Sequence, residues 1–455
     1  MREIILLAAG LGTKLFPYDA VGSKTMRPVA GKPILAHMVQ SLRAFTDAPI
    51  HIVTLRRYSG AVGLAFDCLK GVCVHTLEQS GGTTETLLEG LRHVKGEDVL
   101  ALYGDTWIDP EDLKALYNSG VPAALCYPLC GERSMDWLCA AVEGPAVLSI
   151  GAHHRGGHMT HRLAAFALPT AFAGRLELTP EYFPDMKVGE GAPMERYVEA
   201  ALSTSLSRHP LAALEGKGHY FDVDKPWHLL ELNEYLVHRH CGALTETRLG
   251  EGSTISPLAD IRGSVTLGRN SYIGDRVRVN GSLIVGNDTV IDNGAVFMGD
   301  AVVGSRTKIS NYCQIYDGCS IGNDCIMDHA AELIGGMLMD KVYLYHYCEF
   351  FGAIGSYSDL GAGTLCGTLR FDDNDSMHHI KGRSELVRSS FGSAAYLGDY
   401  CRTGVGTLLM PGTLVGAYTV LGAGVLAQGN IPSRTRVLLE QKQIISEWGE
   451  EKYGW

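Results

Sequence analysis

The residues near the amino terminus that are best suited to chemistry follow a short apolar strand. In the stretch LLAAGLGTKLFP, Gly10, Gly12 and Thr13 let the backbone turn so that several N–H groups point at one place, and Lys14 adds a positive charge. Such a nest of N–H groups binds phosphate oxygens. A strand-to-helix turn without a ligand has a similar composition, so this loop alone is weak evidence.

Further charged residues stand where they can join this loop. The segment KTMRPVAGKPIL supplies Lys24, and Asp105 in LYGDTWID follows an apolar run, at the strand end where open parallel sheets bind ligands. The later stretch YFDVDKPWHLL adds Asp222 and Asp224. Carboxylates beside a phosphate loop suit Mg²⁺, which takes its remaining ligands from phosphates and water. The pattern predicts metal-assisted phosphate chemistry.

The elements that must position these residues alternate between two kinds. Apolar runs typical of strands cover 4–7, 50–55, 72–77, 99–103 and 123–127, and helix-like segments cover 34–45 and 84–94. Strands and helices that alternate at this spacing predict a mixed, mostly parallel sheet covered on both faces, a Rossmann-like α/β domain.

A different period begins at Val265. Apolar residues recur at six-residue steps, each with a small or branched residue two positions earlier. The apolar positions are Leu267, Ile273, Val279, Val285, Ile291, Phe297, Val303, Ile309, Ile315, Ile321 and Met327, and later Leu397, Thr403, Leu409, Val415, Leu421 and Ala427. This is the hexapeptide repeat of a parallel β-helix, with glycine, asparagine and aspartate at the corners.

The register slips after Ala330, and the polar, unperiodic stretch 371–390 is predicted to be a loop that leaves the coils. We therefore predict an α/β domain over 1–240, a linker and start of the coils over 241–264, a β-helix over 265–435 and a tail over 436–455.

Composition excludes several classes of protein. A formal charge of -11 without a lysine or arginine block argues against nucleic acid as a partner. The amino-terminal apolar run is too short for a signal peptide, and no run reaches the length of a membrane span, so we expect a cytoplasmic protein. Twelve scattered cysteines are expected to be reduced. Cys313, Cys319 and Cys325 fill inward slots of the repeat, and the histidines His153, His154, His158 and His161 belong to a solvated loop.

In order, LLAAGLGTKL, KTMRPVAGKPIL, GDTWID and FDVDKPWHLLELNEYLV resemble the sugar-1-phosphate nucleotidyltransferase family. With the hexapeptide region behind them, nearly the whole chain resembles the bifunctional type that joins such an enzyme to a left-handed β-helix acetyltransferase. N-acetylglucosamine-1-phosphate uridyltransferase and its archaeal relatives are of this type. The resemblance implies transfer of a nucleotidyl group from a nucleoside triphosphate to a sugar-1-phosphate, with release of pyrophosphate.

The resemblance also implies roles for single residues. Ala8, Gly10, Gly12 and Thr13 would cradle the triphosphate, Lys14 would neutralise the leaving pyrophosphate, and Lys24 would hold the sugar phosphate or the α-phosphate. Asp105 and Asp222 would hold Mg²⁺, with Asp222 preferred over Asp224. Gln79 would pair with the base, which favours UTP or dTTP, while Gly82 and Thr83 form the wall beside it.

The sequence departs from the family at several points. The family has arginine where this chain has Lys14, and lysine cannot make arginine's bidentate contact with phosphate. At the sugar end, the family's Tyr-Gly-Val stretch corresponds to 138–142 and its Ala-Gly turn to Ala164-Ala165, and a Glu-Lys-Pro segment is absent near 150–154. The sugar is therefore left open.

The acetyltransferase motifs are altered too. Aligned on Gly361-Ala362-Gly363-Thr364, the family's catalytic histidine falls on Tyr345, one residue before His346, and its asparagine falls on Thr368. Lys381 is the remaining candidate for this site. A shift of one residue in a strand turns a side chain to the opposite face, so a base there would miss its substrate.

Three functions stay open. The first is a nucleotidyltransferase whose β-helix builds an oligomer, most simply a trimer. The second is a bifunctional enzyme that also consumes acetyl-CoA to acetylate glucosamine-1-phosphate, and the third is a catalytically weak regulatory or binding homologue.

Overall fold

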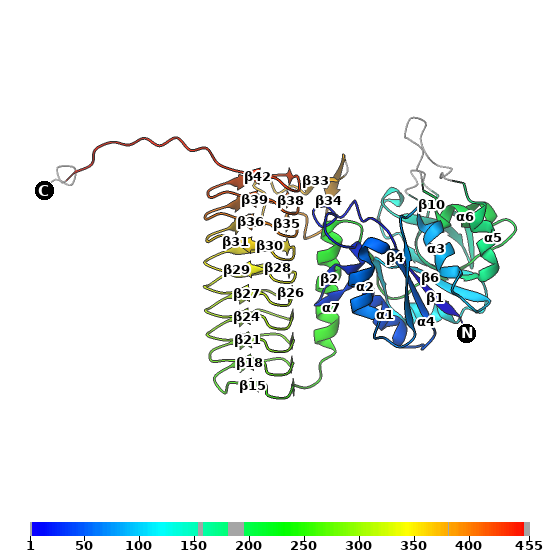
Figure 1. Ribbon diagram of the computed structural model, residues 1–455, viewed down its shortest axis with the longest axis horizontal. Coiled ribbons are helices and arrows are strands. Elements are labelled where there is room, and N and C mark those ends of the chain that lie inside the picture. The colour runs from blue at the N-terminus through cyan, green and yellow to red at the C-terminus, as the bar shows by residue number, and fades with distance from the viewer. Residues whose placement is uncertain (1, 153–157, 181–194, 381, 450–455) are drawn as a thin grey trace.

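The computed structural model describes residues 2–152, 158–180, 195–380 and 382–449, and shows an α/β domain beside a tall stack of short strands (Figure 1). Among these residues no helix has the length and apolar character needed to cross a bilayer.

The amino-terminal sheet has nine strands, in the order β5 (Val72–Leu77), β4 (Ile50–Leu55), β1 (Glu3–Ala8), β6 (Asp98–Tyr103), β11 (His161–Pro169), β8 (Ala123–Pro128), β12 (Ala212–Glu215), β10 (Ala146–Ala152) and β9 (Leu138–Glu143). The predicted strands and helices are confirmed to within three residues at each end. Parallel pairing is confined to β5–β4–β1–β6 and to β12–β8, whereas β11, β10 and β9 pair antiparallel. The prediction of a mostly parallel sheet is therefore wrong for this second half, where short connections such as the one from β9 to β10 reverse the chain.

Helices cover both faces of the sheet, because alternate strand residues point to opposite sides. Ile4 and Leu6 of β1 pack with α1 (Ile34–Arg43), α2 (Ser59–Phe66) and α4 (Pro110–Tyr117). Ile5 and Leu7 pack in a second core with α3 (Thr83–Leu91), α5 (Ala173–Glu177) and α6 (Val198–Ser205). Shorter elements complete the domain: η1 (Lys24–Met26), β2 (Pro28–Val29), β3 (Lys32–Pro33), η2 (Arg56–Tyr58), β7 (Thr106–Ile108), η3 (Ser134–Asp136), η4 (Thr170–Phe172) and β13 (Tyr220–Asp222).

The strands of the second region form three rows, and within each row consecutive strands pair in parallel. Paired residues are about one 18-residue coil apart, except across the longer coil that contains 371–390, where Gly352 pairs with Ala395. One row holds β14 (Arg248–Leu249), β17 (Val265–Leu267), β20 (Leu283–Val285), β23 (Ala301–Val303), β26 (Cys319–Ile321), β28 (Glu332–Leu338), β30 (Glu349–Ile354), β35 (Ala395–Leu397), β38 (Leu414–Val415) and β41 (Asn430–Ile431). The second holds β16 (Asp260–Ile261), β19 (Arg278–Val279), β22 (Val296–Phe297) and β25 (Gln314–Ile315), continues through β28 and β30, and ends with β32 (Leu365–Cys366), β37 (Leu408–Leu409) and β40 (Leu426–Ala427). The third holds β15 (Thr254–Ile255), β18 (Tyr272–Ile273), β21 (Val290–Ile291), β24 (Lys308–Ile309), β27 (Ile326–Met327), β29 (Tyr343–Leu344), β31 (Asp359–Leu360), β36 (Arg402–Thr403), β39 (Val420–Leu421) and β42 (Arg436–Val437).

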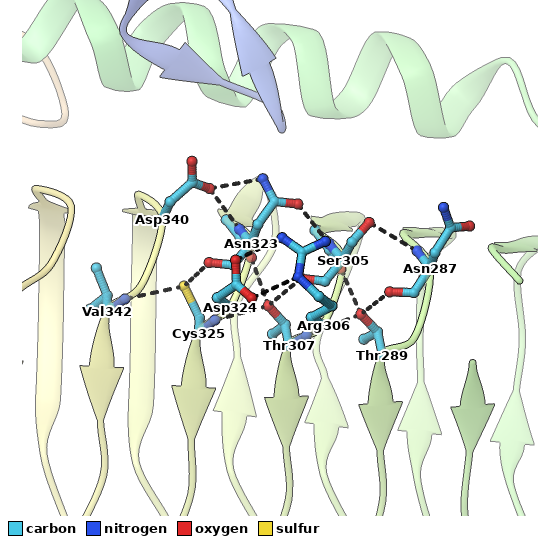
Figure 2. A network of polar contacts seen from close by, with 12 residues as sticks. Asn287, Thr289, Ser305, Arg306, Thr307, Asn323, Asp324, Cys325, Asp340 and Val342 are labelled. Carbon is cyan, nitrogen blue, oxygen red and sulfur yellow. Dashed lines mark hydrogen bonds and ion pairs between the residues drawn. The ribbon is translucent and has the colours of Figure 1, made fainter. Parts of the chain in front are cut away.

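The coils are held together by apolar side chains inside and by polar ladders at the corners. Most of the predicted hexad positions are fully buried, and so are Cys313, Cys319 and Cys325, as expected. At one corner, backbone N–H groups of Asn287 and Ser305 each donate to a polar side chain of the next coil, at 3.0 and 2.8 Å (Figure 2). These ladders satisfy backbone groups that the turn leaves unpaired.

The structure corrects two boundaries of the stack. Its strands extend from Arg248 to Val437, beyond the predicted 265–435, and Leu249, Ile255 and Ile261 continue the six-residue register backwards. The stretch 371–390 is not an irregular loop: β33 (Ser376–Ile380) and β34 (Arg383–Val387) form an antiparallel hairpin. A hairpin without an apolar alternation is hard to recognise, because its buried side chains include Ser376 and His378.

The helix α7 (Pro226–Gly242) joins the two regions and runs alongside the stack (Figure 1). Its buried residues share a core with the α/β domain and with the coils. Asn233, which is 1% exposed, accepts a hydrogen bond from Ala30 N at 2.9 Å and donates to Gly318 O at 3.0 Å. The two regions are therefore packed together, with the carboxyl-end loops of the sheet close to their junction.

Candidate active site

The glycine-rich loop follows β1 and lies directly beside Lys24. Gly12 has a φ of +66°, and a Cβ atom there would lie 2.8 Å from Cβ of Lys24, so both the backbone angle and the space favour glycine. Gly10 and Thr13 are exposed, as a ligand-binding loop requires. Ala8 lies at the end of β1 with its side chain wholly buried against Gly104, so only its backbone could face a ligand.

Lys24 is buried among carboxylates. Its Nζ lies 2.7 Å from Asp105 Oδ2 and 3.2 Å from Asp224 Oδ1, and its side chain is 9% exposed. Burial by itself lowers the pKa of Lys24, but Asp105, Asp224 and Asp222 outweigh burial and raise that pKa above its ordinary value. Lys24 is therefore a fixed positive charge at the centre of the site.

Strand pairing brings Asp222 next to Asp105. The strand β13 pairs antiparallel with β7, so that Asp222 lies opposite Thr106, and Val223 N donates to Asp105 O at 3.0 Å. Burial, and then the negative charges of Asp105 and Asp224, raise the pKa of Asp222 to about 7. This part of the site thus holds more negative charge than its lysines neutralise, and its oxygen donors fit a hard divalent cation.

Asp224 has a role that the sequence did not indicate. Its Oδ2 lies 2.9 Å from Lys14 Nζ, while its Oδ1 faces Lys24, so one carboxylate connects both lysines. Burial would raise the pKa of Asp224, but the two lysines hold it below its ordinary value. The aspartate preferred for metal binding, Asp222, and the aspartate that orients the lysines are therefore different residues.

The predicted base-binding wall lies after β5. Gln79 is exposed, and Gly82 caps α3 with a φ of +110°, where a Cβ atom would lie 2.2 Å from Arg196 O. Thr83 Oγ1 accepts a hydrogen bond from Val198 N at 3.0 Å, so its hydroxyl is used in packing α6. Gln79 is thus available to a ligand, whereas Gly82 and Thr83 pack against the segment that leads into α6.

Sequence reasoning missed Arg162, which lies over the ring of Tyr220, two residues from Asp222. This arginine of β11 is 9% exposed, and its guanidinium carbon lies 3.7 Å from the ring centroid of Trp137 and 4.6 Å from that of Tyr220. Tyr220 and Asp222 share one face of β13, and the charge of Arg162 opposes the upward shift of the Asp222 pKa. The sequence feature that could have indicated Arg162 is its position within the otherwise apolar stretch RLAAF.

The candidates for acetyl transfer do not come together. Tyr345 donates to Asp359 Oδ1 at 3.1 Å, and the ring of His346 packs beside it. Both precede β30, whose Glu349 pairs with Leu365 of β32, whereas Thr368 follows β32. Because β30 and β32 run parallel, Tyr345 and His346 lie before the start of the pair and Thr368 lies after its end. Lys381 lies outside the described residues.

The histidine-rich segment is only partly visible. His153 and His154 lie outside the described residues. His161 is not in a loop but begins β11, where its Nδ1 lies 2.8 Å from Thr160 Oγ1. The strand pairing of β11 with β8, which the sequence pattern did not reveal, is the reason for this difference.

Comparison with known proteins places this geometry in a class. Residues 4–167, which contain the glycine-rich loop, Lys24 and Asp105, match the model of the MobA-like NTP transferase domain. This part of the chain is therefore similar to a nucleoside triphosphate transferase domain.

Similar proteins then extend over nearly the whole chain. A bifunctional protein GlmU from Methanococcus vannielii is 26% identical over 98% of this chain and 99% of its own length, and one from Methanococcus maripaludis is 28% identical over 98% and 99%. A bifunctional sugar-1-phosphate nucleotidylyltransferase/acetyltransferase from Sulfurisphaera tokodaii is 21% identical over 94% and 98%. The protein is a homologue of these bifunctional enzymes over nearly its full length.

Proposed function

We propose that this protein transfers a nucleotidyl group from a nucleoside triphosphate, with UTP or dTTP favoured, to a sugar-1-phosphate, and releases pyrophosphate. The observation that carries the proposal is the placement of Lys24 between Asp105 and Asp224, with Asp222 adjacent, beside a glycine-rich loop. The similarity to bifunctional sugar-1-phosphate nucleotidyltransferases over nearly the full chain supports it.

The roles follow from charge and position. The N–H groups of the loop around Gly10 and Gly12 would bind the triphosphate, and Lys24, held charged by its carboxylates, would neutralise the α-phosphate as it is attacked. Lys14 is oriented by Asp224 and would neutralise the pyrophosphate as it leaves. Gln79 would select the base. Since little covalent chemistry is required, positioning and charge neutralisation would supply most of the acceleration.

Asp105 and Asp222 would hold Mg²⁺. Asp222 lies opposite Thr106, the residue after Asp105, and burial together with the negative charges of Asp105 and Asp224 raises the pKa of Asp222, so a divalent cation would relieve this concentration of charge. When bound, the ion would neutralise the phosphates of both substrates, which otherwise repel each other. Arg162, which lies over the ring of Tyr220 two residues from Asp222, would supply a further positive charge for the sugar phosphate.

The organisation that we propose has an α/β domain over 1–240, joined through α7 to a left-handed β-helix whose strands run from Arg248 to Val437, and a tail after it, with a trimer built through the β-helix. The parallel rows of strands and the hexapeptide register support a β-helix. In this arrangement the stack presents long flat faces, which suit self-association.

Acetyl transfer from acetyl-CoA is the second candidate, because the similar proteins are bifunctional. The residues of this chain favour it less. Tyr345 stands where the family has a catalytic histidine, and Thr368 lies at the other end of the strand pair. Tyr345 is a poor base, because burial and its contact with the Asp359 carboxylate raise its pKa.

The proposal is tested by measuring Mg²⁺-dependent pyrophosphate release from five nucleoside triphosphates, each with a panel of sugar-1-phosphates. We expect one pair to give release that Asp105→Asn reduces by about two orders of magnitude, since the variant removes one charge from the metal site. Release that is unchanged in Asp105→Asn would reject the site. Consumption of acetyl-CoA in the presence of glucosamine-1-phosphate would establish the second candidate.

A further inference from the structure

The segment that connects the glycine-rich loop to Lys24 contacts the coils of the second region. The ring of Tyr18 is 1% exposed, and its hydroxyl donates to Ala353 O of β30 at 2.7 Å. Pro17 O approaches the coil so closely that a Cβ atom on Gly398 would lie 2.7 Å away. The active-site side of the α/β domain is thus seated directly on the stack.

One buried ion pair fixes this contact. Arg27 Nη1 donates to both carboxylate oxygens of Asp399, at 3.0 and 2.8 Å, and the two side chains are 7% and 2% exposed. Asp399 Oδ1 also accepts a hydrogen bond from Ser356 N at 2.8 Å, so the coil holds the carboxylate in place. Hydrogen bonds between two ionised groups are stronger than those between neutral groups.

The same arginine holds the segment before Lys24. Arg27 Nη2 donates to the carbonyl oxygens of Tyr18 and Val21, so the guanidinium closes the turn that separates the glycine-rich loop from Lys24. Arg27 N in turn donates to Lys24 O at 3.2 Å, at the end of the 3₁₀ turn η1. A continuous set of hydrogen bonds therefore runs from Asp399 through Arg27 to the backbone of Lys24.

We propose that Asp399 is a positioning residue for nucleotidyl transfer, which acts through Arg27 to set the place of Lys24. The inference rests on the proposed function for its catalytic consequence, and it assigns the β-helix a part in the site of the α/β domain. The side chains of Arg27 and Asp399 contact each other, the carbonyl oxygens of Tyr18 and Val21, and Ser356 N. Their effect is on the geometry of the segment 15–28.

The structure distinguishes this role from simple attachment of the two regions. Attachment is already supplied by α7, whose Asn233 bridges Ala30 and Gly318. Arg27 also holds the turn between Lys14 and Lys24, because its guanidinium donates to carbonyl oxygens within that turn. Loss of the Arg27–Asp399 pair should therefore alter the geometry of the segment 15–28 while α7 still holds the two regions together.

The test is Asp399→Asn in the full chain. Asparagine keeps an acceptor for Ser356 N but removes the charge and turns an amide donor towards Arg27. We expect amide hydrogens of 15–28 to exchange faster, the thermal midpoint of the coils to change little, and kcat to fall about tenfold or more, with a smaller change in KM. The matched control is Asp324→Asn, which removes the exposed Arg306–Asp324 pair of the stack and should alter neither exchange in 15–28 nor kcat.

Unchanged exchange and unchanged kcat in Asp399→Asn would overturn the inference. A lower thermal midpoint of the coils, together with faster exchange throughout the chain and not only in 15–28, would also overturn the inference, because this result indicates a purely structural role. If Asp399→Asn does not fold, Arg27→Lys removes the second guanidinium nitrogen, which donates to Tyr18 O and Val21 O, and unchanged exchange in 15–28 would have the same meaning. Absence of pyrophosphate release in the natural chain would reject the proposed function alone, since the exchange measurement still tests the positioning.

Discussion

Lys24 and Asp105 form the central contact of the site: Lys24 Nζ lies 2.7 Å from Asp105 Oδ2, and the lysine side chain is almost fully buried. Lysine is rarely buried unless it is paired. The pair places the positive charge of Lys24 beside the carboxylate of Asp105. This arrangement fits a site in which the lysine would bind phosphate and the carboxylate would bind a cation.

Removal of the charge of Lys24 is expected to abolish most of the activity. In Lys24→Met, the developing charge on the α-phosphate loses its buried partner, and kcat should fall by about two to three orders of magnitude. Steady-state kinetics of pyrophosphate release measure this. Lys32→Ala is the matched control in the same motif, because its exposed Nζ contacts only Gln40 Oε1 among the described residues. A loss as large in Lys32→Ala would contradict the assignment.

Lys14→Arg tests the departure from the family. Arginine offers two parallel donors to phosphate where lysine offers a single ammonium. We expect the KM for the triphosphate to fall about fivefold, with kcat changed little, provided that Asp224 still orients the longer side chain. An increase in KM would show that the 2.9 Å contact between Lys14 and Asp224 is adapted to lysine.

The pH dependence of stability should reveal His37. This residue of α1 is 2% exposed, its Nε2 donates to Val29 O at 2.8 Å, and burial lowers its pKa to about 4. An unfolded histidine titrates near 6.5, so the unfolded chain binds the proton first as the pH falls from 6.5 to 4, and stability is lost over that window.

Between pH 7.5 and 5 this one group should lower the free energy of unfolding by about 2 kcal/mol. Urea unfolding at the two pH values measures the change in the natural chain and in His37→Asn. The variant should lose about that much of the pH dependence, while His75 and His228, whose pKa values are also lowered by burial, still contribute. Equal pH dependence in both proteins would contradict the lowered pKa of His37.

The inward and outward positions of the coils are expected to differ sharply. Ile321 of β26 is fully buried, whereas Ile326 of β27 is 36% exposed. Ile321→Ala should destabilise by about 2–5 kcal/mol through lost burial and the cavity left behind, and Ile326→Ala by much less. Thermal unfolding of the two variants compares them directly, and similar midpoints would mean that the register of the hexads is misassigned.

The sequence predicts the repeating part of the fold because each hexad repeats one physical requirement, an apolar side chain that points inward. The register even extends to Leu249, Ile255 and Ile261, which were not included in the predicted β-helix. The antiparallel half of the α/β sheet was harder to predict. Its strands β9, β10 and β11 depend on pairings between segments distant in sequence, which local periodicity does not encode.

The site shows the same division. Asp105 and Asp222 are paired by resemblance, and the β7–β13 pairing sets Asp222 opposite Thr106, the residue after Asp105. The contacts of Asp224 with both lysines, the Arg162 stack and the Arg27–Asp399 pair were not predicted. Each depends on the tertiary approach of charged residues, and a single charged residue in a sequence gives no indication of its partner.

The central claim is tested most directly by following the phosphorus atoms of the triphosphate. With the active nucleotide and sugar-1-phosphate, label at the α-phosphate should appear in the nucleotide sugar, label at the γ-phosphate should appear in pyrophosphate, and the two products should form in equal amounts. Release of the γ label as inorganic phosphate, or its appearance on the sugar, would show hydrolysis or phosphoryl transfer instead and would contradict nucleotidyl transfer.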